Sequence, residues 1–360
     1  MRLKNLSALS LVFGIGLSAC NDSTNPGDSF DPSASAADLE AVGGAFNTDA
    51  YNSLSAMGGN FGVVGAAPAL AASVVDAGWI SVSSPDKWEL YGGEIANALL
   101  SSSAAALLIP DTFRGRTYEH NVEGYFHNPD RAGAPPNGIR FILYEVNPIT
   151  GEPGATEIGW VDVMDESTDL AAVIRLSVWS GEIEYINYTV SASGVINSVS
   201  FDIDGWVTDG TTQVNFTLNL SVDATFATVR AEIDYQVDVP SRDFSIAASM
   251  VVEFNAETQV GSLTIEASFS QANNNVVVQG SIDPQTDGGT LDVLVNGNLF
   301  ATITFAGETI TVVGPDGNAL SQEHALALRK ITDTVGDIFE DTFEDLFNPV
   351  EWLFSSGGSL

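Results

Sequence analysis

Four regularly spaced runs of alternating apolar and polar residues limit what this 360-residue chain can fold into more than any other feature. The runs begin fifteen residues apart and cover residues 199–203, 214–220, 229–235 and 244–250. Successive side chains point to opposite faces of a β-strand, so the alternation predicts strands with one buried face. Fifteen residues hold roughly one ten-residue strand and a short turn, whereas a parallel crossover alone needs about a dozen or more. The spacing therefore predicts a long antiparallel meander.

The strand pattern continues on both sides of these runs. It starts at about Arg116 and is interrupted by residues typical of turns. Asn296-Gly297 separates two of the later runs and is the strongest short-range signal for a β-hairpin. Further strands are expected at residues 139–146, 158–163, 170–179, 183–190, 263–269, 276–282, 291–295, 299–305 and 309–313. About a dozen strands over residues 111–318 predict a mostly β protein, a large antiparallel meander that forms a curved sheet or a barrel.

Helical segments are expected in residues 36–110, before the β region. Ser35 and Asp38 have the spacing of a capping box, and Gly43-Gly44 weakens the helix that would follow. Apolar residues recur in it at helical spacing: Leu39, Val42, Phe46, Ala50 and Leu54. Residues 94–109 predict a second helix that ends at Pro110.

An amphipathic helix is expected in residues 319–360, after the β region. Ser321 would cap it and Pro349 would end it. Its apolar stripe consists of Leu328, Ile331, Val335, Ile338, Phe339, Phe343, Leu346 and Phe347. The opposite side is acidic, so the pattern favours a helix packed on the sheet, or over the mouth of a barrel, rather than one bound to an anionic lipid surface.

The first nineteen residues have the layout of a secretory signal peptide. Arg2 and Lys4 precede an apolar run over residues 6–16, which is followed by small residues. A run of this length is too short for a transmembrane helix, which needs about twenty residues. The pattern predicts that the chain is exported and that residues 1–19 are removed.

Leu17-Ser18-Ala19-Cys20 resembles the lipobox of bacterial lipoproteins. The resemblance covers only the signal and implies cleavage before Cys20, followed by acylation of its sulfur and its new amino group. Cys20 is the only cysteine and cannot form an internal disulfide, which agrees with a lipidated residue. Asn21 follows it instead of the aspartate that favours inner-membrane retention in some enteric bacteria, so the resemblance favours the outer membrane. Residues 20–35 would form a flexible tether, and the alternative is an ordinary signal peptide with an accidental cysteine.

Net charge excludes one class of partner. The chain has 12 basic and 47 acidic residues, a formal charge of −35. Such a protein repels phosphate backbones, so nucleic acid is not expected to bind. With 44% hydrophobic residues the chain can still bury a core, so the acidity does not indicate disorder.

No metal or cofactor site emerges from the sequence. The histidines are His120, His127 and His324. In an extended strand His120 would lie on the same face as Tyr118, whereas His127 would lie on the other face. These two histidines are therefore not expected to form a ligand pair. The aspartates Asp202, Asp204, Asp209, Asp283 and Asp287 resemble fragments of calcium loops. They lack the spacing and terminal glutamate of an EF-hand, so they are interpreted as turn residues. No phosphate-binding, dinucleotide-binding or serine-hydrolase motif is present, and no cofactor is expected.

The sequence patterns predict the cellular location of the protein more clearly than its activity. Six tryptophans could stack on sugars if exposed, although aromatic residues in strands more often lie in the core. With 47 acidic residues, carboxylate pairs carry no information on catalysis, and a non-enzymatic role is the expectation. The leading hypothesis is a lipid-anchored envelope lipoprotein whose β domain is structural or binds a ligand, with the protein partner undetermined. The alternatives are a carrier of lipid or another hydrophobic molecule, and a transmembrane β-barrel.

Overall fold

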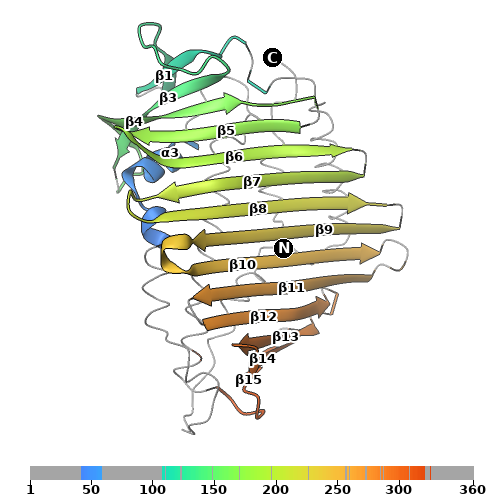
Figure 1. Ribbon diagram of the computed structural model, residues 1–360. Coiled ribbons are helices and arrows are strands. Elements are labelled where there is room, and N and C mark those ends of the chain that lie inside the picture. Colours follow the sequence, from blue (N-terminus) through green and yellow to red (C-terminus); the bar gives the residue numbers. More distant parts are fainter. Residues whose placement is uncertain are drawn as a thin grey trace. The chain divides into compact units, whose positions relative to one another are not determined.

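The structure, a computed structural model, describes residues 42–58, 108–109, 111–121, 124–147, 149–169, 171–195, 197–225, 227–255, 258, 260–271, 274–283, 285–286, 288–307, 309–320 and 325. These residues contain one fifteen-stranded sheet with the order β15-β14-β13-β12-β11-β10-β9-β8-β7-β6-β5-β4-β3-β1-β2 (Figure 1). From β3 to β15, strands that follow one another in sequence are neighbours in the sheet. The predicted mostly β fold with an antiparallel meander is confirmed.

The four regularly spaced runs form the middle of this sheet. They become β7 (Ser198–Thr208), β8 (Gln213–Ala224), β9 (Thr228–Val239) and β10 (Phe244–Asn255). A short 3₁₀ helix, η3 (Pro240–Arg242), joins the last two. Neighbouring side chains in these strands point to opposite faces of the sheet as expected, since Leu218 is 2% exposed whereas its neighbour Asn219 is exposed.

The remaining strands extend the sheet in both directions. On one side lie β1 (Arg116–Asn121), β2 (Gly124–His127), β3 (Gly138–Val146), β4 (Pro153–Asp165), β5 (Ala171–Ser180) and β6 (Ile183–Val195). On the other lie β11 (Val260–Gln271), β12 (Asn274–Asp283), β13 (Gly288–Val295), β14 (Asn298–Ala306) and β15 (Thr309–Val313). The β13–β14 hairpin turns at the predicted Asn296-Gly297, where both residues have positive φ, 51° and 77°.

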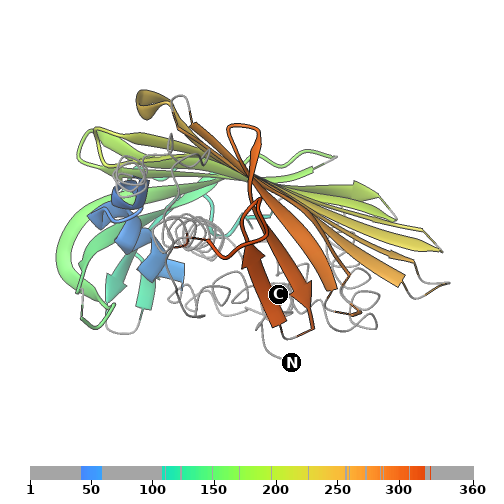
Figure 2. The same cartoon turned by 90° about the horizontal axis from the view of Figure 1, so that it is seen from below.

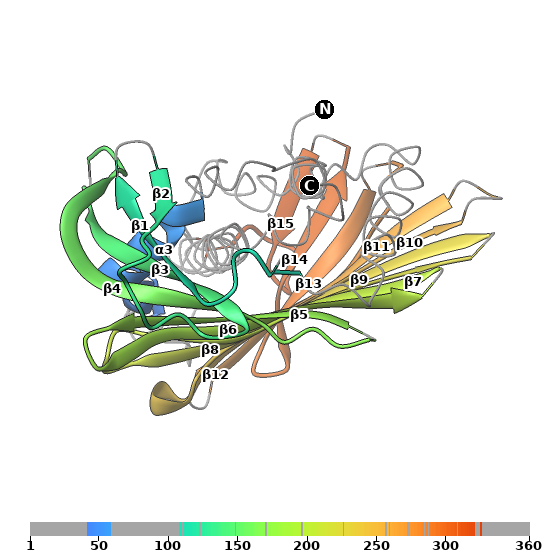
Figure 3. The same cartoon turned by 90° about the horizontal axis from the view of Figure 1, so that it is seen from above.

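One pairing in the sheet is parallel. β1 pairs antiparallel with β2 but parallel with β3, so the β1–β2 hairpin lies beyond β3 at one end of the strand order (Figure 3). The opposite end is β15, and within the part of the chain that the structure describes the two ends do not pair with each other. The sheet is therefore open, and the predicted barrel is not confirmed.

The N-terminal helix is broken at a different place than the sequence indicates. Residues 42–45 are helical, the chain then turns, and helix α3 (Asp49–Gly58) begins, whereas the predicted weak point was Gly43-Gly44. The Thr48 side chain accepts a hydrogen bond from the Tyr51 amide at 3.1 Å, and Asp49 lies in the first turn. Threonine at the N-cap and aspartate beside it start a new helix here.

Helix α3 covers part of one sheet face. It packs against β3, β4, β5 and β6, as Figures 2 and 3 show. Its buried side chains include Leu54 and Met57, both 1% exposed. Among the described residues, no helix is long and apolar enough to cross a membrane.

The chain divides into two compact units, and the boundary lies within β8 after Thr217. The unit with α3 and β1–β7 has a core that includes Phe141, Ile174 and Tyr188. The unit with β9–β15 has a core that includes Phe244, Phe269 and Leu291.

Several predictions fall outside the described residues. These are the signal peptide and tether, most of the helix at residues 94–109, and the C-terminal helix apart from residue 325. The end of the second helix can be compared, because Ile109 is described and is not helical.

Candidate functional site

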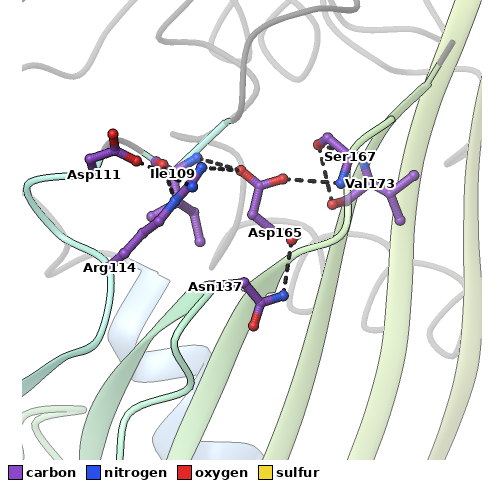
Figure 4. Close-up of polar contacts among 7 residues, drawn as sticks. All are labelled: Ile109, Asp111, Arg114, Asn137, Asp165, Ser167 and Val173. Atoms are coloured by element: carbon purple, nitrogen blue, oxygen red, sulfur yellow. Dashed lines mark hydrogen bonds and ion pairs between the residues drawn. The ribbon is translucent and has the colours of Figure 1, made fainter. Parts of the chain in front are cut away.

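A buried carboxylate lies at the centre of a polar cluster around Asp165, the last residue of β4 (Figure 4). Its side chain is fully buried, and both carboxylate oxygens accept hydrogen bonds. Oδ2 accepts from the Ile109 amide at 2.9 Å, and Oδ1 accepts from the Ser167 amide at 3.1 Å. The Arg114 Nη2 atom adds a charged contact to Oδ2 at 3.5 Å. The buried carboxylate therefore has two amide donors and one cation, as an ionised carboxylate in a core requires.

Neighbouring contacts connect this carboxylate to three segments of the chain. Arg114 donates from Nε to the Ile109 carbonyl at 2.9 Å and pairs with the exposed Asp111 at 3.2 Å. Asn137, just before β3, donates from Nδ2 to the Asp165 carbonyl at 3.0 Å, and its own carbonyl accepts from the Asp165 amide at 3.1 Å. The segment before β1, the turn before β3 and the end of β4 are thus held together.

The contacts of the Asp165 cluster are those of a structural site that joins chain segments. Ser167 is the only nearby hydroxyl shown in Figure 4, and it is occupied: its Oγ accepts from the Val173 amide at 3.0 Å and lies 3.4 Å from the Val173 carbonyl. A nucleophile would need an adjacent base, and Asp165 does not contact this hydroxyl in any described hydrogen bond. Within the described ranges, no three His, Cys, Asp or Glu side chains gather as a metal site would require.

Sequence reasoning missed Asp165, although a signal was present. Val161 and Val163 are buried, and Asp165 continues their parity on the same face of β4. A carboxylate at an apolar parity position must find donors or lose its charge, so it marks a buried polar contact. The partners themselves come from loops and were not predictable from β4.

The predicted placement of the histidines is wrong. In the β1–β2 hairpin Tyr118 pairs with His127 and His120 with Tyr125. Directly opposed residues point to the same face, so His120 and His127 share a face with Tyr118. The chain reverses between Asn121 and Gly124, and this reversal invalidates a parity count carried through the turn.

Each of these histidines lies beside a tyrosine ring of the β1–β2 hairpin. The ring centroids of His120 and Tyr125 lie 5.1 Å apart, and those of Tyr118 and His127 5.7 Å apart. Burial lowers the pKa of His120 and raises the pKa of Tyr125, whose hydroxyl donates to the Ile142 carbonyl at 3.1 Å. Both shifts disfavour the charged forms, as burial among apolar side chains does.

The aspartates interpreted as turn residues separate into two groups. Asp209 is in the β7–β8 turn, where its Oδ1 accepts from the amides of Thr211 and Thr212 at 2.7 and 2.6 Å. Asp283 ends β12 and accepts from the Gln285 amide at 2.8 Å. Asp202 and Asp204 lie inside β7, so for these two the turn interpretation is wrong. Asp287 is outside the described residues.

Two tryptophans lie on the polar face of the sheet rather than in the core. Trp160 and Trp179 are opposed across β4 and β5, with nearly parallel rings whose centroids are 6.4 Å apart. The Arg140 guanidinium lies 4.8 Å from the Trp160 ring and is paired with Asp162 by two hydrogen bonds of 2.7 Å. Because these rings lie against each other and against Arg140, they indicate a stacked aromatic pair that links two strands more than a surface on which a sugar could stack.

The unit with β9–β15 has an apolar surface that is incompletely covered. On the core face, Tyr235, Ile246 and Phe269 are buried. Farther along these strands Ala231 and Leu263 are also buried, but larger neighbours on the same face are only half-buried. We call these residues the half-buried apolar patch: Ile233, Met250, Val252, Ile265 and Ile282. They adjoin across β9–β12, since Met250 pairs with both Ile233 and Ile265.

The predicted lipidation site, Cys20, lies outside the described residues. Comparisons with protein-family models, with curated proteins and with solved structures found no match for this chain.

Proposed function

We propose that this protein is an exported bacterial envelope lipoprotein, anchored by acyl chains on Cys20, whose β domain is structural or binds a ligand outside the membrane. The observation that carries the proposal is Leu17-Ser18-Ala19-Cys20, which follows a basic start and a short apolar run. More than one acyl chain is needed for stable anchoring, and lipidation at both the sulfur and the amino group would supply this. Asn21 favours the outer membrane, on its periplasmic or cell-surface side.

The described sheet agrees with a domain held beyond the membrane surface. Most of its strands, such as β8 and β9, alternate between a buried apolar face and a more exposed polar face. The polar face includes exposed acidic residues such as Asp204, Asp234 and Glu266. An acidic face is repelled by anionic head groups, so the acyl chains rather than the sheet would make the membrane contact.

Cell fractionation of a Cys20→Ala variant tests the anchor. We expect the full-length protein to pellet with membranes and the variant to appear in the soluble fraction. Ser23→Ala, in the proposed tether, is the matched control and should still pellet. A Cys20→Ala protein that remains in the membrane pellet after washing with high salt would place the anchor elsewhere.

The half-buried apolar patch favours a second function, the carriage of a lipid by its acyl chain. Long apolar side chains on adjacent strands can contact an alkyl chain, and each buried methylene contributes about 0.8 kcal/mol. On the opposite face of β10, Ser249 and Glu253 are polar and flank Val251, so the long apolar side chains are concentrated on the core face of the strand.

Lipid extraction from purified protein tests this second function. We expect bound lipid in the wild type by mass spectrometry, and loss of that lipid in Met250→Glu, which puts a charge into the half-buried apolar patch. Ser249→Glu adds the same charge on the other face and should retain the lipid. Equal lipid in both variants, or none in the wild type, would leave the structural or other ligand-binding role.

A further inference from the structure

Among the described strands, β15 lies at one end of the sheet, and its five residues carry no charge. Among the described residues β15 pairs with β14 on one side only. Its sequence is Thr309-Ile310-Thr311-Val312-Val313, in which every residue is β-branched. Thr309 and Thr311 are exposed, and the other three side chains are half-buried. Natural edge strands are usually blunted by charges, proline or bulges, and β15 has none of these within its five residues.

Pairing with β14 fixes which way each β15 side chain points. Val312 lies opposite the buried Ile303, so Val312 and Ile310 are on the core face. Thr311 lies opposite Thr304, and both are exposed on the polar face. The core face of the edge thus carries Ile310 and Val312, and the other face carries Thr309, Thr311 and Val313.

We propose that β15 pairs antiparallel with β15 of a second copy of this chain, about a two-fold axis through Thr311. In this register Thr311 meets its own counterpart, Ile310 meets Val312, and Thr309 meets Val313. A two-fold axis perpendicular to the sheet keeps both core faces on the same side, so the core-face residues Ile310 and Val312 oppose each other. The strand is thus complementary to itself, and this favours a second copy over an unrelated strand.

The dimer is expected to be weak and salt-dependent. Five paired residues bury little area compared with the roughly 1,200 Å² or more of stable interfaces. No carboxylate lies within residues 309–313, but each chain has a formal charge of −35, so the copies repel each other at a distance. Screening by salt should therefore strengthen the association.

Cysteine cross-linking of the full-length protein tests the pairing in cells. Directly opposed residues on antiparallel strands have Cα atoms about 4.5–5.5 Å apart, within the range that a disulfide spans. After oxidation, Thr311→Cys should give a reducible band at twice the monomer mass. Wild type, with Cys20 alone, and Thr304→Cys, on the same face but one strand inward, should remain monomeric.

The register can be tested separately. Thr309→Cys and Val313→Cys copies expressed together should form a mixed dimer, whereas Thr309→Cys alone should not cross-link. Dimers of Thr309→Cys alone, or Thr311→Cys cross-linking no greater than that of Thr304→Cys, would overturn the proposal. Circular dichroism of each variant establishes that the cysteine has not unfolded the sheet.

Discussion

At the scale of single residues, Arg114 in the Asp165 cluster forms one buried and one exposed ion pair, so the two can be compared directly. Arg114 contacts both Asp165, whose side chain is fully buried, and Asp111, whose side chain is 90% exposed. The two aspartates share a partner and differ in burial. Burial determines how much the loss of a charge costs, because a desolvated partner cannot be satisfied by water.

Asp165→Asn is therefore expected to destabilise the fold by roughly 2–4 kcal/mol, since it leaves Arg114 and two backbone amides without a charged acceptor. Asp111→Asn should leave the denaturation midpoint unchanged, because exposed ion pairs contribute little. Urea denaturation followed by circular dichroism gives both values. Equal effects of the two substitutions would show that Asp165 does not hold the segments together.

Asp202 should make stability depend on pH in the opposite direction from a paired carboxylate. Burial raises its pKa above the ordinary value of 3.8, a hydrogen bond from Ser191 opposes the shift, and the Asp204 charge adds to it. The folded state therefore disfavours the ionised form, and the resulting penalty is present above the folded pKa and disappears below 3.8, where both states are protonated.

Asp202→Asn removes this penalty, so we expect a higher melting temperature than wild type at pH 7 and no difference near pH 3. The control is Asp234→Asn on the exposed face of β9, which should show no comparable gain. Melting curves across pH measure both variants. A gain for Asp202→Asn that persists unchanged at pH 3 would contradict the electrostatic cause.

At the scale of elements, strands were more predictable than the contacts between loops. Alternation depends on each strand's own residues, so β7–β10 and the Asn296-Gly297 hairpin could be predicted directly. The break before α3 depended on the cap at Thr48, which the glycines at 43 and 44 obscured. The Asp165 cluster joins residues up to 56 positions apart, and no local pattern specifies such partners.

Gly159 shows how closely β4 and β5 approach. A Cβ atom there would lie 1.9 Å from the Trp179 carbonyl oxygen, which is backbone and cannot move aside. Gly159→Ala should therefore separate the two strands and cost about 3 kcal/mol, the upper part of the usual range for overpacking. Gly44→Ala, where a Cβ atom would meet nothing within 4 Å, should be neutral or stabilising. Thermal denaturation distinguishes them, and a Gly159→Ala protein as stable as wild type would contradict this packing.

At the scale of the whole molecule, net charge is the dominant electrostatic feature. Cleavage before Cys20 would remove Arg2 and Lys4 and no acidic residue, leaving 10 basic and 47 acidic residues. Repulsion within so acidic a chain opposes the compact state and weakens as salt shortens the screening length.

The melting temperature should therefore rise as NaCl increases from about 0.02 M to about 0.3 M. KCl should act equally, because screening does not depend on the identity of the cation. Calcium at matched ionic strength should add little. A saturable gain at micromolar calcium would instead indicate a specific site and contradict the interpretation of Asp202, Asp204 and Asp209 as non-ligands.

The measurement that tests lipid anchoring most directly is mass spectrometry of the N-terminal peptide of protein taken from the membrane fraction. Glu40 is the first glutamate after Cys20, so a glutamate-specific protease would release residues 20–40 of the processed chain. We expect this peptide to begin at Cys20 and to carry the added mass of acyl chains, and a peptide that retains Ala19 to be absent. An unmodified Cys20 inside a peptide that still contains Ala19 would contradict a lipoprotein.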